Sequence, residues 1–436
     1  MEQYRRKRVY LETYGCTLNQ ADSDIMIGRL EEAGYGLAKD ESSADAIILN
    51  TCTVKEATEH KIMSRISRIW DSGKPLVVAG CLTVNRKKME KLAPGVSIVG
   101  AGSITHIAEA VSGAINKEKL IFEDSEAKEG LPRIFTAPIL RIPICEGCTS
   151  NCYFCQTKLA RPGLRSYTQK TIIQWVEQGL KNGAKEIQMT AMDSGVYGMD
   201  LEPNGGTKNG LVELIHNVNA IDGDFLVRLG MINPQHVKRL GNGLLGAIKL
   251  PKIYKFVHIP VQSGSEQICK AMNRQHTVAD FYEIIRDYRN EIPEILITTD
   301  MIVGYPGEEE SDFEDTLKLI ENGKLDVVNL SKFSPRPGTK AKEMRDKRLS
   351  TQVVKKRSEV ANLLIKEKSA EINAKLVGKE YEVLITEKHA KKLDFTGRNI
   401  NYKQVIVKGF RGKIGERVFV EIVDSNYGAL FGKKME

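Results

Sequence analysis

The 436-residue sequence contains no apolar run long enough to span a bilayer. Its basic N-terminus, MEQYRRKR, is followed by VYLETYGC rather than by a long apolar stretch, so it does not resemble a secretory signal peptide. We therefore expect a cytoplasmic protein with no membrane contact. Disulfides are rare in the reducing cytosol, and the eight cysteines are expected to bind metal or carry redox chemistry instead.

The sequence also lacks a strong excess of one charge and a phosphate-binding loop. Lys and Arg number 64 against 56 Asp and Glu, a formal net charge of +8, which permits nucleic-acid binding without proving it. The segment GYPGE at 304–308 lacks the Gly-Lys-Ser/Thr ending of a P-loop. The length favours about three domains.

What is present is a dense run of cysteines in IPICEGCTSNCYFCQTKLARP. Cys148, Cys152 and Cys155 have the spacing Cys-x3-Cys-x2-Cys, Phe154 precedes the last of them, and a basic segment follows. Three thiolates so close together can hold three corners of a cubic iron–sulfur cluster, which leaves the fourth iron open. An open metal position is a place for a substrate or cofactor to bind.

A zinc site is the alternative interpretation of the same run. With Cys145 included, four thiols could form a four-thiolate zinc knot. Structural zinc sites usually separate their two Cys-x2-Cys pairs by a longer stretch, whereas only Thr149, Ser150 and Asn151 lie between the pairs here. We therefore favour the iron–sulfur cluster and interpret Cys145 as a bystander thiol.

Three further cysteines lie far apart in the N-terminal third. Apolar segments at 7–12, 45–50 and 75–79 alternate with helical segments, which predicts a parallel α/β sheet. A cysteine follows the end of each predicted strand: Cys16, Cys52 and Cys81. Because ligands bind at the carboxyl edge of such sheets, these thiols are expected to hold a second cluster with an open iron. The alternative is that they are small, buried turn residues.

The middle of the chain again alternates strands and helices. Strands are predicted at 186–190, 225–230, 256–264, 295–308 and 327–339. Repeated βα units favour a barrel or partial barrel, with its chemistry at the carboxyl ends of the strands. The polar or turn residues at these ends are Asp193, Tyr197, Arg228, Asn233, Gln262, Ser263, Asp300 and Gly304. Taken singly, each is a cap or turn residue, and Cys269 in a helical pattern is interpreted as core.

The C-terminal segment changes character. A charged helix is predicted over 350–375 with Ser350 as its N-cap, and short strands separated by Gly, Asn and Asp then predict a small β-barrel. From Val377 onward, twelve Lys and Arg face eight Asp and Glu. If Phe395, Tyr402 and Phe410 are exposed, this barrel could contact RNA by charge and stacking; an ordinary solvated face is equally compatible with the charge.

The motifs together resemble one known family. LETYGCTLNQADSD, LNTCTV and VVAGC, with the Cys148–Cys155 run, are similar to the radical S-adenosylmethionine (SAM) methylthiotransferases over nearly the whole chain. The resemblance implies an α/β protein with three parts: an N-terminal parallel α/β sandwich, a central radical SAM partial (β/α) barrel, and a small C-terminal β-barrel called TRAM, which binds RNA. The expected boundaries are 7–116, 135–372 and 373–435.

The resemblance also implies cofactors. Cys148, Cys152 and Cys155 would hold the 4Fe-4S cluster that cleaves SAM, and Cys16, Cys52 and Cys81 would hold a second, auxiliary 4Fe-4S cluster. One SAM would methylate a sulfur at the auxiliary cluster, and a second would supply the radical that removes hydrogen from the substrate. PVQSGS, TDMIVGYPGE and SPRPGT resemble the walls of the cofactor and substrate site. The expected cofactor-binding residues are Phe154, Asp193, Arg228, Gln262, Ser263 and Gly304.

The segments TKLARPGLRSY and TAMDSGVYGMD resemble the branch that modifies N6-threonylcarbamoyladenosine in tRNA, with Pro162 as a small departure. An acidic, polar loop containing Asp193 would suit a threonylcarbamoyl group better than a prenyl tail. The implied reaction is 2-methylthiolation of this base at position 37, next to the anticodon. The implied partners are ANN-decoding threonylcarbamoylated tRNA, an electron donor (a reductase or a flavodoxin or ferredoxin type) and a sulfur donor. The alternatives are a methylthiotransferase acting on prenylated adenosine or on a ribosomal-protein aspartate, and a non-enzymatic zinc-bearing RNA-binding protein.

Metal content after anaerobic purification tests this interpretation. We expect about eight irons with matching acid-labile sulfide in the intact protein, and about four when Cys16, Cys52 and Cys81 are all replaced by Ala. An equal iron content in both proteins would mean that the N-terminal thiols are structural. Zinc without iron would instead support the RNA-binding alternative.

Overall fold

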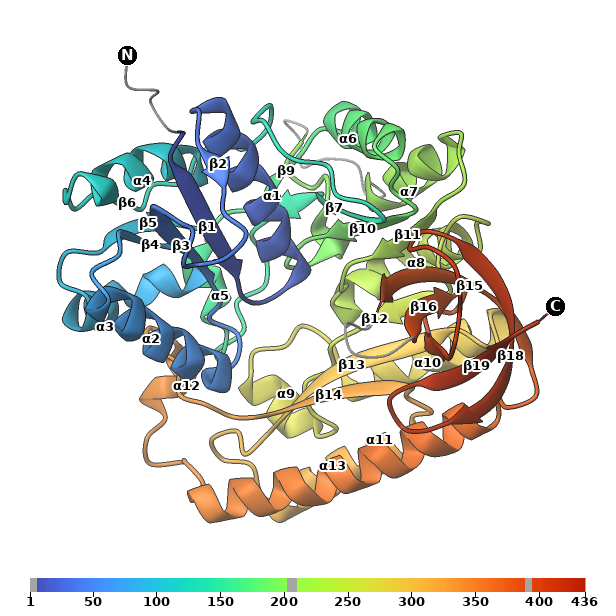
Figure 1. Cartoon of the computed structure of the whole chain (residues 1–436). Coiled ribbons are helices and arrows are strands. Elements are labelled where there is room, and N and C mark those ends of the chain that lie inside the picture. The colour runs from blue at the N-terminus through green and yellow to red at the C-terminus, as the bar shows by residue number, and fades with distance from the viewer. Residues whose placement is uncertain (1–5, 202–209, 389–393, 436) are drawn as a thin grey trace.

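The computed structural model describes residues 6–201, 210–388 and 394–435; the first five residues of MEQYRRKR lie outside this part. Figure 1 shows three regions: an N-terminal sheet with helices, a central set of strands and helices, and a small C-terminal barrel. This α/β architecture with a closed C-terminal barrel confirms the predicted fold class.

The N-terminal region is a six-stranded parallel sheet in the order β2-β1-β3-β4-β5-β6. Its strands are β1 Arg8–Thr13, β2 Gly36–Leu37, β3 Ala46–Thr51, β4 Leu76–Gly80, β5 Ser97–Gly100 and β6 Ile121–Phe122. All six residues of β3 are buried, as expected for a central parallel strand covered on both faces.

Helices cover both faces of this sheet. They are α1 Thr17–Glu32, α2 Glu56–Asp71, α3 Arg86–Leu92 and α4 Ile107–Ile115. Side chains of α1 and α4, such as Ile25 and Val111, form one apolar cluster with Ile48, whereas α2 and α3 pack on the opposite face through Ile66 and Met89. The three predicted strands and the helices between them are thereby confirmed.

The central region forms an open, partial barrel of six parallel strands. They lie in two sheets, β11-β10-β7 and β12-β13-β14, joined by a bridge between Val227 and Ile253. The strands are β7 Ile139–Pro143, β10 Glu186–Thr190, β11 Leu226–Leu229, β12 Phe256–His258, β13 Leu296–Val303 and β14 Val327–Lys332. Short strands β8 Cys145–Glu146 and β9 Arg165–Ser166 pair beside them.

Three of the predicted strands are too long. The segments predicted to extend to 264, 308 and 339 leave β structure at His258, Val303 and Lys332. Each contains proline beyond that point, and proline cannot donate a ladder hydrogen bond. The extra residues form loops at the carboxyl ends of the strands instead.

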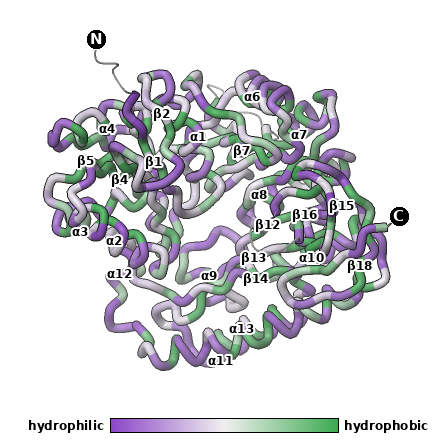
Figure 2. The backbone as a smooth tube through the Cα atoms, viewed as in Figure 1, coloured by the Kyte–Doolittle hydropathy of each residue, from purple (hydrophilic) through white to green (hydrophobic). Residues whose placement is uncertain are grey.

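The central helices lie outside the strands. They are α5 Thr157–Ala160, α6 Gln169–Lys181, α7 Gly210–Ala220, α8 Pro234–Ile248, α9 Glu266–Ala271, α10 Val278–Glu291, α11 Glu310–Asn322, α12 Lys340–Glu343 and α13 Thr351–Ala374. The predicted N-cap Ser350 accepts a hydrogen bond from the Val353 amide. Buried residues of α13 recur every four positions from Arg357 to Asn373, and Figure 2 shows hydrophilic and hydrophobic segments alternating along this helix. No helix in the described ranges combines the length and apolarity needed to cross a bilayer.

The C-terminal barrel is closed by five strands in the order β15-β16-β17-β19-β18. They are β15 Glu380–Lys388, β16 Phe395–Asn399, β17 Gln404–Val407, β18 Arg417–Ser425 and β19 Leu430–Lys434. The small β-barrel is confirmed. Strands β16 and β19 each carry a glycine, Gly397 or Gly432, which weakens their strand signal in the sequence.

The aromatic residues of this barrel are not those expected on its surface. Phe395 and Phe410 are buried and meet edge to face at 5.3 Å, and Tyr402 is partly buried against the central region. The expectation that these three rings are exposed is therefore wrong. The exposed aromatic side chains here include Phe419 and Tyr427, since Phe419 occupies an outward position of β18.

The turn between β16 and β17 inserts the barrel into the central region. Tyr402, with φ of +60°, packs on Tyr254 and Phe256 at the beginning of β12, and the Ile400 carbonyl accepts a hydrogen bond from the Lys255 amide at 2.8 Å. This turn therefore closes the end of the partial barrel where its strands begin.

Truncating this contact should loosen the docked barrel. We expect Tyr402→Ala to cost about 3 kcal/mol of stability, because it empties an aromatic site between two regions. The exposed Phe419→Ala is the control and should change stability by less than about 0.5 kcal/mol. Thermal melting and amide hydrogen exchange of 395–407 measure the difference; equal effects of the two substitutions would contradict the role of the Tyr402 contact.

Candidate functional site

Three thiols gather at the carboxyl edge of the N-terminal sheet. Cys16 caps α1 just after β1, Cys52 follows β3, and Cys81 follows β4. The sheet order makes these three strands neighbours. The sequence pattern thus placed the cysteines correctly at one edge of one sheet.

The thiols influence one another. Burial, with a smaller contribution from the neighbouring Cys16 and Cys81, raises the pKa of Cys52 to about 11, although the Val54 amide opposes the shift. Burial also raises the pKa of Cys81, although the Arg161 guanidinium opposes this shift. Such thiols stay protonated alone, whereas a bound metal would compensate the charge of their thiolates.

The backbone at Gly15 lies so close to Cys52 that it leaves no room for a side chain. Gly15 has φ of +102°, and a Cβ atom there would lie 2.6 Å from the Cys52 Cβ and 2.7 Å from its Sγ. The Asn19 amide donates to the carbonyls of Tyr14 at 2.7 Å and Thr51 at 3.1 Å, which ties two of the cysteine loops together. The donor set and this close approach fit a thiolate-bound cluster.

The second group of thiols lies in the loop after β8. The Ser150 amide donates to the Cys148 Sγ at 3.4 Å, and the Arg274 guanidinium donates to the Cys152 Sγ at 3.3 Å. Burial raises the pKa of Cys148 to about 11 and also raises that of Cys155. These donors would stabilise thiolates, so this loop also fits a cluster.

Cys145 is more deeply buried than the other thiols of this run. Its side chain is fully buried, and its Sγ lies 3.7 Å from the Asp193 carbonyl oxygen. In the part of the chain that the structure describes, no three His, Cys, Asp or Glu side chains could share a single metal ion. Thiolates on a cubic cluster bind separate irons, so a cluster does not require three of these side chains to converge on one ion. Cys269 is likewise buried in the apolar core, as interpreted from the sequence.

The two cysteine loops touch. The hydroxyl of Thr53, which follows Cys52, hydrogen bonds to the side-chain oxygen of Gln156, which follows Cys155. The Gln156 amide in turn donates to the Asn85 side chain and to the Pro337 carbonyl, each at 3.0 Å. Loops that lie about a hundred residues apart in the sequence are therefore in direct contact.

A buried network of charges holds the two regions together beside this site. Lys128 bridges Asp22 of α1 at 2.8 Å and Glu146 of β8 at 2.7 Å, and Arg161 pairs with the same two carboxylates. All four side chains are largely removed from solvent. On the far side of the contact, Arg336 pairs with the buried Glu59 of α2.

Comparisons with known proteins agree with this arrangement. Family models match residues 8–100 (the uncharacterized protein family UPF0004), 142–320 (the radical SAM superfamily) and 374–435 (the TRAM domain). A probable threonylcarbamoyladenosine tRNA methylthiotransferase of Pyrococcus abyssi is 39% identical over 98% of this chain and 99% of its own length. The chain belongs to the radical SAM tRNA methylthiotransferase family.

Relatives of this methylthiotransferase extend to animals. The threonylcarbamoyladenosine tRNA methylthiotransferase of Drosophila melanogaster is 33% identical and covers 99% of this chain and 78% of the relative. Among solved structures, the cobalamin-dependent radical enzyme OxsB superposes with a TM-score of 0.52 at 13% identity, over 81% of this chain and 56% of that one. The methyltransferase TsrM from Kitasatospora setae gives the same score at 14% identity, over 74% and 73%. These two structures share the fold.

Several residues expected to contact the cofactor lie deeper in the methylthiotransferase than the sequence suggested. Asp193 is fully buried; its carboxylate accepts hydrogen bonds from the Gly195 amide at 3.0 Å and the Asn233 side chain at 2.6 Å. The Asn233 oxygen then accepts from Arg274, the donor to Cys152. Asp193 is therefore linked through Asn233 and Arg274 to Cys152, and its contact with the cofactor stays a prediction. Its burial weakens the sequence argument that its carboxylate faces a threonylcarbamoyl group.

The other polar or turn residues predicted at the strand ends also differ in burial and in what they contact. Ser263 is fully buried beside Thr316, and the Tyr197 hydroxyl bonds to a backbone carbonyl, so both support loops. At Gly304, a Cβ would point into Val354 of α13. Gln262, by contrast, has φ of +78°, a strained conformation for a residue with a side chain. Phe154 is partly buried against the cluster that contains Tyr305.

The inner face of the partial barrel carries polar groups. Val227 and Leu229 of β11 join the apolar core under the helices, so Arg228 between them faces inward. Deeper along β12 and β13, the His258 Nε2 lies 3.0 Å from the Asp300 carboxylate. Burial raises the pKa of Asp300, but the hydrogen bond from His258 and its charge more than offset this and hold it below the usual value. Sequence analysis overlooked His258, although alternation with buried Val257 could have indicated it.

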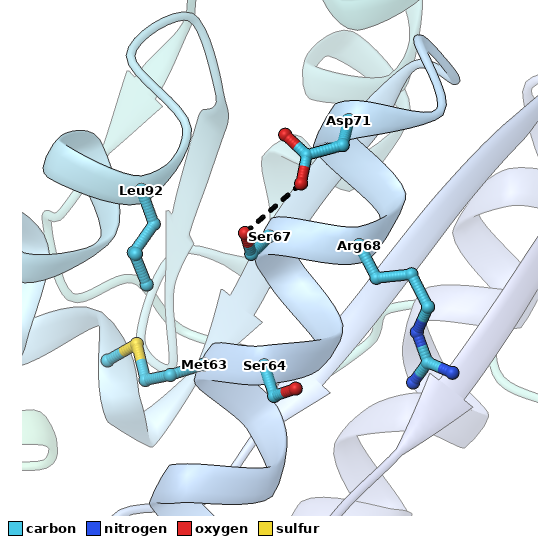
Figure 3. A pocket seen from close by; sticks show the side chains of 6 residues that line it. All are labelled: Met63, Ser64, Ser67, Arg68, Asp71 and Leu92. Atoms are coloured by element: carbon cyan, nitrogen blue, oxygen red, sulfur yellow. Dashed lines mark hydrogen bonds between the residues drawn. The ribbon is translucent and has the colours of Figure 1, made fainter.

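A separate surface groove lies along α2. Its lining residues are Met63, Ser64, Ser67, Arg68, Asp71 and Leu92. Figure 3 shows these side chains around the C-terminal half of the helix, with the Ser67 hydroxyl directed at Asp71. None of the candidate cysteines or inner-face residues lines it, so we exclude it from the site.

The close approach of Gly15 to Cys52 can be tested. Gly15→Ala adds about 1–2 kcal/mol of backbone strain and drives a methyl group into the thiol, so the iron content should fall from about eight to about four. Gly34→Ala is the matched control: Gly34 also has positive φ, +85°, but a Cβ there meets nothing within 4 Å. Iron analysis of both variants measures the effect, and equal iron in the two would contradict a thiol site shaped by Gly15.

Proposed function

We propose that this methylthiotransferase converts N6-threonylcarbamoyladenosine at position 37 of tRNA to its 2-methylthio derivative. The proposal uses two SAM molecules and two 4Fe-4S clusters. In it, Cys148, Cys152 and Cys155 hold the cluster that supplies an electron for the cleavage of SAM. The ligands of a second, sulfur-carrying cluster are the N-terminal thiols Cys16, Cys52 and Cys81.

The observation that carries the proposal is the hydrogen bond between Thr53 and Gln156. It joins the residue after Cys52 to the residue after Cys155. Two groups of three thiols, each suited to a cluster with one open iron, would then face a common space. Inserting sulfur at an aromatic carbon requires the hydrogen-abstracting group and the sulfur to reach the same substrate carbon, which two distant clusters could not do.

The protein's own residues would position and tune these groups. Arg274 links Cys152 to Asn233 and, through it, to Asp193. Arg161 would place a positive charge beside Cys81, since its guanidinium lowers the pKa of that thiol. Such surrounding donors usually orient ligands and adjust the properties of the metal.

The substrate is supported by the relatives. The archaeal and animal proteins that resemble this chain over nearly its full length are named for threonylcarbamoyladenosine in tRNA. We extend the proposal to ANN-decoding tRNAs, to a reductase or a flavodoxin- or ferredoxin-type electron donor, to a separate sulfur donor, and to the cytoplasm, where tRNA is found.

We propose that the chain divides into a sulfur-carrying region (7–116), a radical SAM core (135–372) and an RNA-binding barrel (373–435). The barrel presents exposed Phe419 and Tyr427, and Lys366 lies 5.3 Å from the Tyr427 ring. Exposed rings beside cations suit stacking with bases and attraction to phosphates.

The two cluster roles can be separated by mutation. Cys152→Ala should abolish both SAM cleavage and tRNA modification, because it removes a ligand of the cluster that reduces SAM. Cys16→Ala should still release 5′-deoxyadenosine but leave tRNA without the methylthio group. Liquid chromatography of deoxyadenosine and mass spectrometry of tRNA nucleosides measure the two outcomes. Normal deoxyadenosine release by Cys152→Ala would refute the assignment, and a modified peptide with unmodified tRNA would favour a protein substrate.

A further inference from the structure

We propose that Arg228, on the inner face of the partial barrel, binds the carboxylate at the end of the threonylcarbamoyl group. This inference rests on the proposed function and assigns the residue that selects its substrate. It moves Arg228 from the expected cofactor wall to the substrate. The ligand class is an adenosine whose N6 substituent ends in a carboxylate.

Arg228 lacks an anionic partner. Within the described ranges, its guanidinium makes no hydrogen bond or ion pair, and its buried Nε has no acceptor. Its contacts are two aromatic rings: the guanidinium carbon lies 5.1 Å from the Phe256 ring centre and 5.9 Å from that of Tyr402. A cation held by rings is partly desolvated but still has unused donors, which is the arrangement that binds a carboxylate strongly.

Two buried arginines elsewhere in this protein do have carboxylate partners. Arg161 pairs with Asp22 and Glu146, and Arg357 pairs with Glu308 at 2.7 Å. A buried charge is costly unless it is paired, so these carboxylates explain why those arginines are tolerated. Among the residues that the structure describes, no carboxylate forms such a pair with Arg228.

Two acids on the inner face, Glu186 and Asp300, already accept hydrogen bonds from other residues. Glu186 accepts hydrogen bonds from Tyr254 at 3.0 Å and Tyr402 at 3.3 Å. Asp300 is bonded to His258 at 3.0 Å and to the Asn329 amide at 2.9 Å. Both carboxylates are therefore satisfied by neutral or imidazole partners, and Arg228 remains available to an acid that enters with a ligand.

The location of Arg228 suits the N6 substituent of the adenosine rather than the adenine ring that reacts. The cysteine loops lie beyond the carboxyl ends of the strands, whereas Arg228 reaches toward Phe256, at the beginning of β12, and Tyr402, which closes that end of the barrel. A base held near the cysteines would direct its N6 chain along the inner face toward Arg228. A prenyl chain would instead leave the guanidinium unpaired, so the same residue would disfavour it.

The test compares two anticodon stem-loop RNAs that differ only in carrying adenosine or N6-threonylcarbamoyladenosine at position 37. Fluorescence anisotropy measures their dissociation constants for the iron-loaded full-length protein without SAM, so the readout does not depend on catalysis. The wild type should bind the modified RNA more tightly. Arg228→Met should weaken binding of the modified RNA by about ten- to hundredfold, as expected for hydrogen bonds to a charged group, and leave the unmodified RNA unchanged.

Lys252→Met is the matched control. Lys252 also lies over a ring, 4.7 Å from the centre of Phe225, but that ring belongs to the apolar core under the helices. The Lys252→Met variant should keep the wild-type preference for the modified RNA. Iron content and melting temperature establish that each variant is folded, and Arg228→Gln repeats the comparison if the Met variant is not.

The outcomes separate this inference from the proposed function. A preference that persists in the folded Arg228 variants overturns the inference and leaves the proposed function standing. Equal weakening for both RNAs also overturns it, because Arg228 would then contact the RNA backbone. A wild type without any preference, together with tRNA that gains no methylthio group, would remove the proposed substrate itself.

Discussion

The buried charge network between the N-terminal sheet and the central barrel is the constraint on which the site depends. Asp22 and Glu146 come from different regions, and Lys128 and Arg161 each bind both. The Tyr167 hydroxyl adds a hydrogen bond to Glu146 at 2.9 Å. Removing one partner of a buried pair typically costs about 3–5 kcal/mol, because the remaining charge is left without compensation. The network therefore favours one position of the N-terminal sheet relative to the central barrel, because any shift between them would separate these charges.

That position brings together the two sets of three cysteines, one from each region. Each group lies at the carboxyl end of its own parallel strands, where loops are free to carry ligands. Neither sheet alone determines the distance between these edges. The contact between Thr53 and Gln156, and the pair of Arg336 with Glu59, connect the same two regions at other points. The chemistry proposed for the chain is thus a property of the interface between them.

The C-terminal barrel contributes to the site as well as to its surroundings. Its β16–β17 turn closes the partial barrel with Tyr402, and this ring then supports Arg228 from below. Lys403 of the same turn forms a buried pair with Asp326, at 2.7 Å, just before β14. A module expected to hold RNA therefore also closes the end of the partial barrel toward which, in our proposal, the threonylcarbamoyl group extends. Weakening the turn should affect both binding of RNA and selection of the modified base.

The sequence by itself determined the cysteine positions and the elements that carry them, since the strand alternation, the turn residues and the spacing of thiols are local properties. The bounds of β10 and the N-cap of α13 were predictable for the same reason. Only the tertiary structure decided which polar residues face the site. Asp193 follows an apolar strand and Arg228 lies within one. The Asp193 carboxylate is buried among hydrogen-bond donors, whereas the Arg228 guanidinium makes no hydrogen bond or ion pair with the residues that the structure describes. Burial and pairing depend on residues distant in sequence, so no local pattern could distinguish them.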